Sequence, residues 1–198
     1  MLPKTLDHIA SWSWEVNSDD DDLTLADACD RLATAAHVLT DEGLCVPRTM
    51  KVSWLRAGEG YSGFASLMDI DPAAALTAPD MARDVPIGRP AGLPDAEPQS
   101  ITLSGPGAWI DAQGREEREH DLVDATVYLA PWFLDITVGV RHSIWRRTDF
   151  SGRPHPQVYR RNAPRLARAL EGIEKALDLE TAPGEPTSYG VPDKYGIT

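Results

Sequence analysis

The sequence predicts an α+β fold: a single domain with a mostly antiparallel sheet of about six strands and two main helices packed on one face. Helical periodicity is strong in only two segments, at about 24–41 and 163–178. Strand-like segments separated by turn residues follow one another between them. Because helices do not alternate with strands along the chain, the order disfavours a doubly wound parallel sheet.

The first predicted helix spans about 24–41. An apolar stripe at helical spacing is formed by Leu25, Ala28, Cys29, Leu32, Ala35, Ala36 and Leu39. Thr24 and Asp27 have the spacing of a capping box, with Asp in place of the usual Glu or Gln. The acidic residues before the helix suit its positive end, and Gly43 is a natural stop.

A hairpin and a proline-rich segment follow this helix. Apolar and polar residues alternate over 50–54, residues 58–60 predict a turn, and 61–70 returns as a second strand. Six prolines then interrupt 71–99, which has no sustained period. We expect a long loop there, with a short helix at most at 72–77, and a loop of this length is generally a binding element or mobile.

Four further strands are predicted before the second helix, at 100–103, 108–111, 122–129 and 132–145. In the last of these, one face is almost wholly apolar and should face the core. This apolar face includes His142, whereas Asp135 and Arg141 lie on the opposite face.

The second main helix is expected over about 163–178, capped by Asn162 and with Pro164 in its first turn. The turn-rich residues after it predict an extended tail over 181–198. The domain is therefore expected to span 1–180.

Composition places the chain among ordinary soluble proteins. Of its 198 residues 42% are apolar and 25% are charged. Cys29 and Cys45 are expected to be small buried residues in a reducing compartment. The N-terminus lacks the order of a signal peptide, and no apolar run approaches the ~18 residues of a membrane span. We therefore expect a cytoplasmic protein without membrane contact.

Charge is distributed very unevenly along the chain. The net charge is −12, yet 141–175 holds nine basic and three acidic residues, whereas 1–30 holds eight acidic residues and one basic residue. The basic segment either pairs with acids of 15–30 and 116–124 inside the fold, contacts a protein, or holds a small phosphate- or carboxylate-bearing anion. The anion site would use Arg141, His142 and Arg165. The net negative charge disfavours nucleic acid as a partner.

The acidic run comprises Asp19, Asp20, Asp21 and Asp22. It lacks the Gly and Glu of a calcium-binding EF-hand loop, so we interpret it as a surface that steers a basic protein. Trp12 and Trp14 would share a face of an extended segment beside it, and are expected to contact the same partner. Trp109 and Trp132 lie near strand ends or turns, where an indole can anchor an interface.

No catalytic or cofactor signature is present. The sequence contains neither a nucleophile elbow, a phosphate-binding loop nor a dinucleotide fingerprint. Glu116 and His120 could share a face, but nothing supplies a third metal ligand. We therefore expect no metal and no cofactor, and the sequence leans against an enzyme without deciding the question.

The leading interpretation is a small protein-binding module, of an inhibitor or immunity type, that neutralises a basic partner by occlusion. Two alternatives remain open at this point. One is an enzyme or ligand-binding protein with the Arg/His anion pocket, and the other is a scaffold or assembly subunit. The oligomeric state is not predicted.

Overall fold

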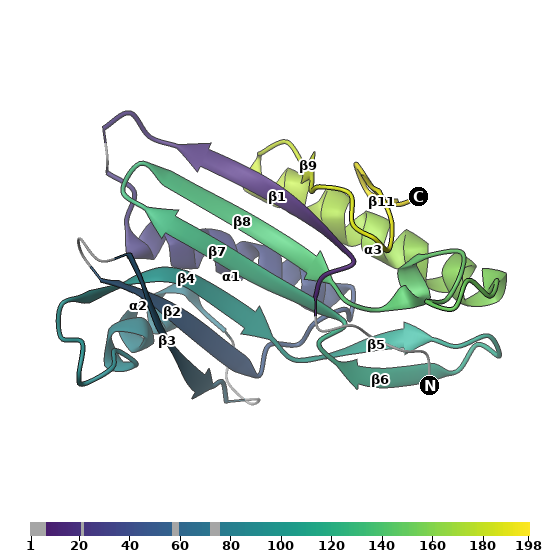
Figure 1. Ribbon diagram of the computed structural model, residues 1–198, viewed down its shortest axis with the longest axis horizontal. Helices are drawn as coiled ribbons and strands as arrows, with labels where there is room; N and C mark the ends of the chain where they lie inside the picture. Colours follow the sequence, from purple (N-terminus) through teal and green to yellow (C-terminus); the bar gives the residue numbers. More distant parts are fainter. Residues whose placement is uncertain (1–6, 21, 57–59, 72–75) are drawn as a thin grey trace.

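A seven-stranded antiparallel sheet, in the order β3-β2-β4-β7-β8-β1-β9, organises the chain (Figure 1). The structure is a computed structural model, and it describes residues 7–20, 22–56, 60–71 and 76–198. The strands of the sheet are β1 (Ala10–Asn17), β2 (Thr49–Arg56), β3 (Gly60–Asp69), β4 (Ala96–Ser104), β7 (Val123–Ala130), β8 (Phe133–Val140) and β9 (Ala182–Pro183). The predicted α+β class and antiparallel sheet are confirmed.

Two small hairpins and three α-helices complete the described part of the chain. The hairpins pair β5 (Pro106–Ile110) with β6 (Glu116–His120), and β10 (Pro192–Asp193) with β11 (Gly196–Ile197). The α-helices are α1 (Leu25–Asp41), α2 (Ala78–Ile87) and α3 (Pro156–Leu177), and a short 3₁₀ helix covers Ser143–Trp145. Figure 1 shows α1 behind β7 and β8, and α1 also contacts α2 and α3.

Alternation along the strands separates an apolar core from a polar sheet face. In β8, Leu134, Ile136, Val138 and Val140 are buried, as predicted, and His142 beyond the strand is also fully buried. The other side of the sheet, which we call the open face, carries mostly hydroxyl and charged side chains. They include Ser11, Ser13, Thr49, Lys51, Thr102, Ser104, Asp124, Thr126, Tyr128, Asp135, Thr137 and Arg141.

The helix α1 has the ends that the sequence predicts. Thr24 accepts a hydrogen bond from the Asp27 backbone N–H, and the Asp27 carboxylate accepts one from the Thr24 backbone N–H, which completes a capping box. Gly43 follows the helix with a φ of +66°, a conformation that glycine adopts without strain.

The proline-rich segment contains a helix that its sequence period does not reveal. The expected loop over 71–99 is interrupted by α2, which Thr77 caps by accepting the backbone N–H of Asp80. Of residues 72–77, where a short helix was expected at most, 72–75 lie outside the described residues and the remaining two precede α2. The helix contacts α1, and Met81 and Val85 are buried in the core. Tertiary packing of two apolar side chains therefore stabilises a helix too short to show a pattern.

The last main helix begins seven residues earlier than predicted, at Pro156. Asn162 is not its cap. The fully buried Asn162 amide instead accepts the backbone N–H of Ile110 at 2.8 Å and donates to the carbonyls of Ile110 and Val158. Because its amide pairs with the backbone N–H and carbonyl of Ile110 at the end of β5, this residue joins α3 to the β5–β6 hairpin.

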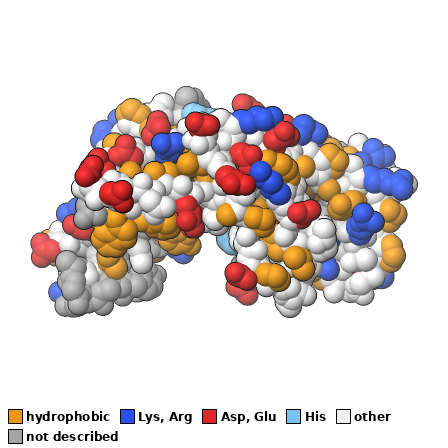
Figure 2. Space-filling view, turned by 90° about the horizontal axis from the view of Figure 1, so that it is seen from above, with side chains coloured by type: hydrophobic (Ala, Val, Ile, Leu, Met, Phe, Trp, Pro, Cys, Tyr) orange, Lys and Arg blue, Asp and Glu red, His pale blue; other side chains and the backbone are white. Residues whose placement is uncertain are grey.

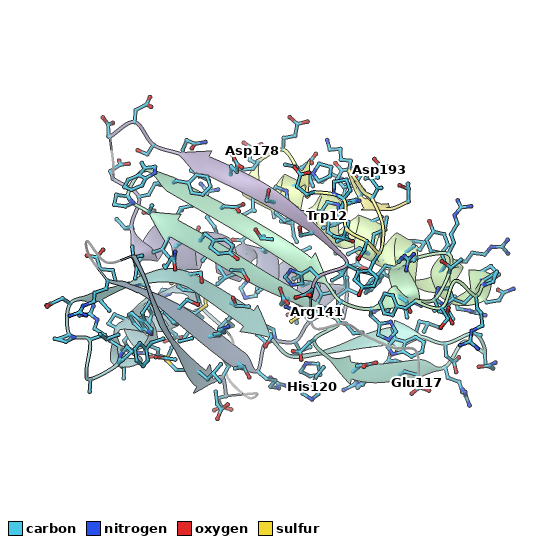
Figure 3. All side chains as sticks on the ribbon, viewed as in Figure 1. Trp12, Glu117, His120, Arg141, Asp178 and Asp193 are labelled. Atoms are coloured by element: carbon cyan, nitrogen blue, oxygen red, sulfur yellow. The ribbon has the colours of Figure 1, made fainter. Side chains whose placement is uncertain are left out.

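The C-terminal segment is folded back on the domain rather than simply extended. β9 pairs with β1, and the Trp12 indole donates to the Asp193 carbonyl at 2.7 Å (Figure 3). The Thr181 backbone N–H donates to Glu174 on α3, at 2.9 Å. Hydrogen bonds, first from Thr181 and then from Tyr195, lower the pKa of Glu174 to about 2.

Candidate functional site

The acidic run lies in the turn between β1 and α1, beside an exposed tryptophan. Asp19, Asp20 and Asp22 are exposed, and Asp21 lies outside the described residues. The backbone N–H groups of Ser18 and Leu23, which flank the run, donate to the carbonyls of Trp132 and Pro131, both at 3.0 Å. We call this arrangement of the acidic turn and the β7–β8 turn the acidic end.

Trp132 supplies the apolar part of the acidic end. Its side chain is 58% exposed, although large aromatic residues are usually well buried. The sequence marks it as a possible anchor only through its place beside Pro131, between two predicted strands. An exposed indole on a turn that is hydrogen-bonded to an acidic turn can pack against a partner and accept a cation on its ring.

Trp12 and Trp14 do not take part in this surface. Both are fully buried, because β1 is an inner strand of the sheet and places its alternate side chains in the core. The Trp14 indole donates to the Thr181 hydroxyl at 3.0 Å. The expectation that these two side chains contact a partner is therefore corrected: they hold β1 and the C-terminal segment in place.

A second surface lies between β3 and α2, partly within the 71–99 segment for which a binding element was one expectation. A groove of about 490 Å³ has methionines in its lining, with Asp69, Asp71, Asp80 and Asp84 around them. Arg83 belongs to the same lining and pairs with Asp80 and Asp84. The groove methionines are Met50, Met68 and Met81. Methionine adapts its shape to different apolar partners, so the lining suits contact with a protein segment.

The basic segment is divided between structural pairs and a basic surface. Arg168 pairs with Glu42 at 2.9 Å, and Arg141 pairs with Asp124. Other arginines at the beginning of α3 and before it are exposed: Arg147, Arg153, Arg160 and Arg161. Figure 2 shows basic side chains gathered at its right-hand end, where α3 begins in Figure 1. The charge asymmetry is thus partly presented at the surface.

The three residues of the predicted anion pocket do not converge. Arg141 lies on the open face, whereas His142 lies in the core, where its Nδ1 accepts the Ile144 backbone N–H at 3.1 Å. Arg165 donates to the backbone carbonyls of Ala108 and Glu42, at 2.6 and 2.8 Å. Arg165 therefore fixes loops to α3, and the structure does not bring the three side chains into one site.

Arg141 instead belongs to a polar network on the open face. Asp124, which is 1% exposed, accepts hydrogen bonds from Arg141 and from Nε2 of His8, the latter at 3.0 Å. The imidazole lies flat against β8, since a Cβ at Gly139 would come within 2.3 Å of it. Burial first, and then the nearby Arg141 charge, lower the pKa of His8 to about 4.

This pKa predicts a specific pH dependence of stability. The pKa of His8 is 6.5 in the unfolded chain and about 4 in the folded chain. Between these two pH values the unfolded state therefore binds the proton more strongly than the folded state does. The free energy of unfolding should fall as the pH falls from 6.5 to 4, by about 3 kcal/mol at most from this residue. Denaturation of a His8→Gln variant should show a smaller loss across this window, and the exposed His37→Gln should behave like the parent. A His8 ring that titrates above pH 6 by NMR would contradict the prediction.

The described residues reveal no metal centre and no membrane-crossing helix. Across the described ranges, no cluster of three or more His, Cys, Asp or Glu side chains could hold a metal ion. None of the described helices combines the length and apolar character needed to cross a bilayer. Cys29 and Cys45 are free and buried, and burial raises their thiol pKa values to about 11 and 12.

Comparison with known proteins gives no match. No family model matches the chain, and neither a curated protein nor a solved structure is similar to it.

Proposed function

We propose that this chain is a protein-binding module that holds a basic partner at its acidic end, in the manner of an inhibitor or immunity protein. The observation that carries the proposal is the exposed Trp132, tied by backbone hydrogen bonds to a turn of exposed carboxylates. Interfaces commonly combine an aromatic anchor with charges that steer the partner. The partner would be neutralised because the bound module covers its functional surface.

The methionine-lined groove extends this proposal to a second contact. Its apolar lining, with four acidic residues and one basic residue around it, suits a partner segment with apolar and basic side chains. Ile87, which is 76% exposed, adds apolar surface beside it. A cytoplasmic location is part of the proposal, and the two free thiols support a reducing environment.

The acidic turn should control the rate of association. Asp19→Asn/Asp20→Asn removes two exposed charges that hold no hydrogen bond across the described residues, and should slow association several-fold and flatten its salt dependence. The measurement is a pull-down from native lysate at low and high salt, followed by kinetics with the recovered basic protein. Glu117→Gln/Glu185→Gln is the matched control, since it removes the same charge from two exposed side chains elsewhere. Equal effects of the two double variants would show that only net charge matters and would refute the assigned site.

A further inference from the structure

A polar groove on the open face lies apart from the surfaces assigned to the partner. It has a volume of about 420 Å³, within the roughly 300–1,000 Å³ typical of small-molecule sites. Strands β2, β3, β4 and β7 line it, together with His8, Asp121 and Arg141. The β3 residue is Leu67, an exposed apolar side chain. The lower edge of Figure 2, which is the side facing the viewer in Figure 1, is hollowed in its middle.

The network of Asp124, Arg141 and His8 lies at this groove. Asp124 is 1% exposed, and burying a carboxylate costs free energy unless the group is paired and hydrogen-bonded. Arg141 and His8 supply the charge and the hydrogen bonds that Asp124 requires. Gly139 is required because any larger residue would displace the imidazole. The side chains are therefore held in place before any ligand arrives, as in preorganised binding sites.

The remaining lining indicates the chemistry of the ligand. The hydroxyls of Thr102 and Thr126 lie 2.9 Å apart, and the hydroxyl side chains Thr49 and Ser104 lie in the same groove. Each hydroxyl both donates and accepts hydrogen bonds, which matches the hydroxyl groups of a ligand.

The charges of the lining are balanced. Lys51 and Arg141 are cationic, whereas Asp121 and Asp124 are anionic. A ligand anion would meet the two carboxylates, and a ligand cation would meet the two basic groups. The balance therefore favours an uncharged polar ligand over either ion.

An aromatic side chain completes the groove. Tyr128 belongs to the lining and is 46% exposed, so the side chain is accessible to a ligand in the groove. We propose that this groove binds a neutral polyhydroxylated ring, the chemistry of a saccharide, which packs on Tyr128 and bonds to the threonine hydroxyls and the Asp124–Arg141 pair. The ring could be a free sugar or part of a glycan.

NMR titration of the labelled full chain tests this proposal. The probes are glucose, galactose, mannose and N-acetylglucosamine, the trisaccharides maltotriose and chitotriose, and the charged analogues glucose 6-phosphate and glucosamine. We expect at least one neutral probe to shift the Thr126 and Tyr128 signals with a millimolar or tighter Kd. A trisaccharide that binds more tightly than its monomer indicates a glycan, and the reverse indicates a free sugar.

Two substitutions assign the binding to the groove. Tyr128→Ala should weaken the best probe at least tenfold, and Thr126→Val should weaken it several-fold. Thr137→Val is the matched control, because Thr137 lies opposite Thr126 on β8 but outside the groove lining. The proposal is overturned if no neutral probe shifts these signals, if a charged analogue binds tenfold more tightly than glucose, or if the control weakens binding as much as Thr126→Val.

Discussion

Trp12→Ala should lower the free energy of unfolding by about 3–5 kcal/mol, the cost of truncating a buried tryptophan. The side chain is fully buried, and its indole donates to the Asp193 carbonyl. Truncation therefore leaves a cavity beneath β1 and removes the hydrogen bond to the Asp193 carbonyl. Because Trp12 also pairs with Pro183 of β9, the C-terminal segment should lose amide protection along with global stability.

Chemical denaturation and hydrogen exchange measure this effect. Trp132→Ala, the same substitution at an exposed site, should change stability by no more than about 0.5 kcal/mol. Trp12→Phe should recover most of the packing but not the hydrogen bond. Equal stabilities of the Trp12→Ala and Trp132→Ala variants would mean that Trp12 is not a core residue.

The features that the sequence predicts well are those encoded locally. The capping pair Thr24 and Asp27 and the stripe that follows them define α1 within a few residues. Alternation alone assigns the two faces of β8. Such patterns depend on neighbours close in the chain, so no knowledge of the rest of the fold is needed.

The features that the sequence does not predict depend on distant partners. β1 is an inner strand because it pairs with β8, whose residues follow it by more than a hundred positions. Asn162 is a residue type common at helix caps, but its amide instead forms hydrogen bonds with the backbone of Ile110 on β5. Pro156, which suits a helix start, lies within a Pro/Gly-rich stretch that reads as a loop.

The candidate site also combines features that the local sequence reveals with features that depend on residues distant in the chain. The exposed carboxylates of Asp19 and Asp20 are evident from their run along the chain. Which tryptophans accompany them is decided by burial: Trp12 and Trp14 turn into the core, while Trp132 remains exposed. His8 and Asp124 are 116 residues apart, so their contact requires the assembled sheet.

Asp124→Ala should destabilise the protein by about 3–5 kcal/mol, because it removes the buried carboxylate that pairs with the partly buried Arg141 guanidinium. His8 would lose its acceptor at the same time. Asp124→Asn keeps an acceptor but removes the charge, and should lie between the parent and Asp124→Ala. Denaturant titrations of the three proteins at pH 7 provide the comparison.

The double variant Asp124→Ala/Arg141→Ala separates two explanations of this network. If the loss in Asp124→Ala comes from an Arg141 guanidinium that has lost this carboxylate, removing Arg141 as well should recover about 1–3 kcal/mol, whereas additive losses would contradict this explanation. If removing both charges costs little free energy of unfolding, the buried ion pair adds little net stability. Since the pair lies at the groove with Tyr128 and the threonines, such a result would favour ligand binding over stability as the reason that charges occupy the open face.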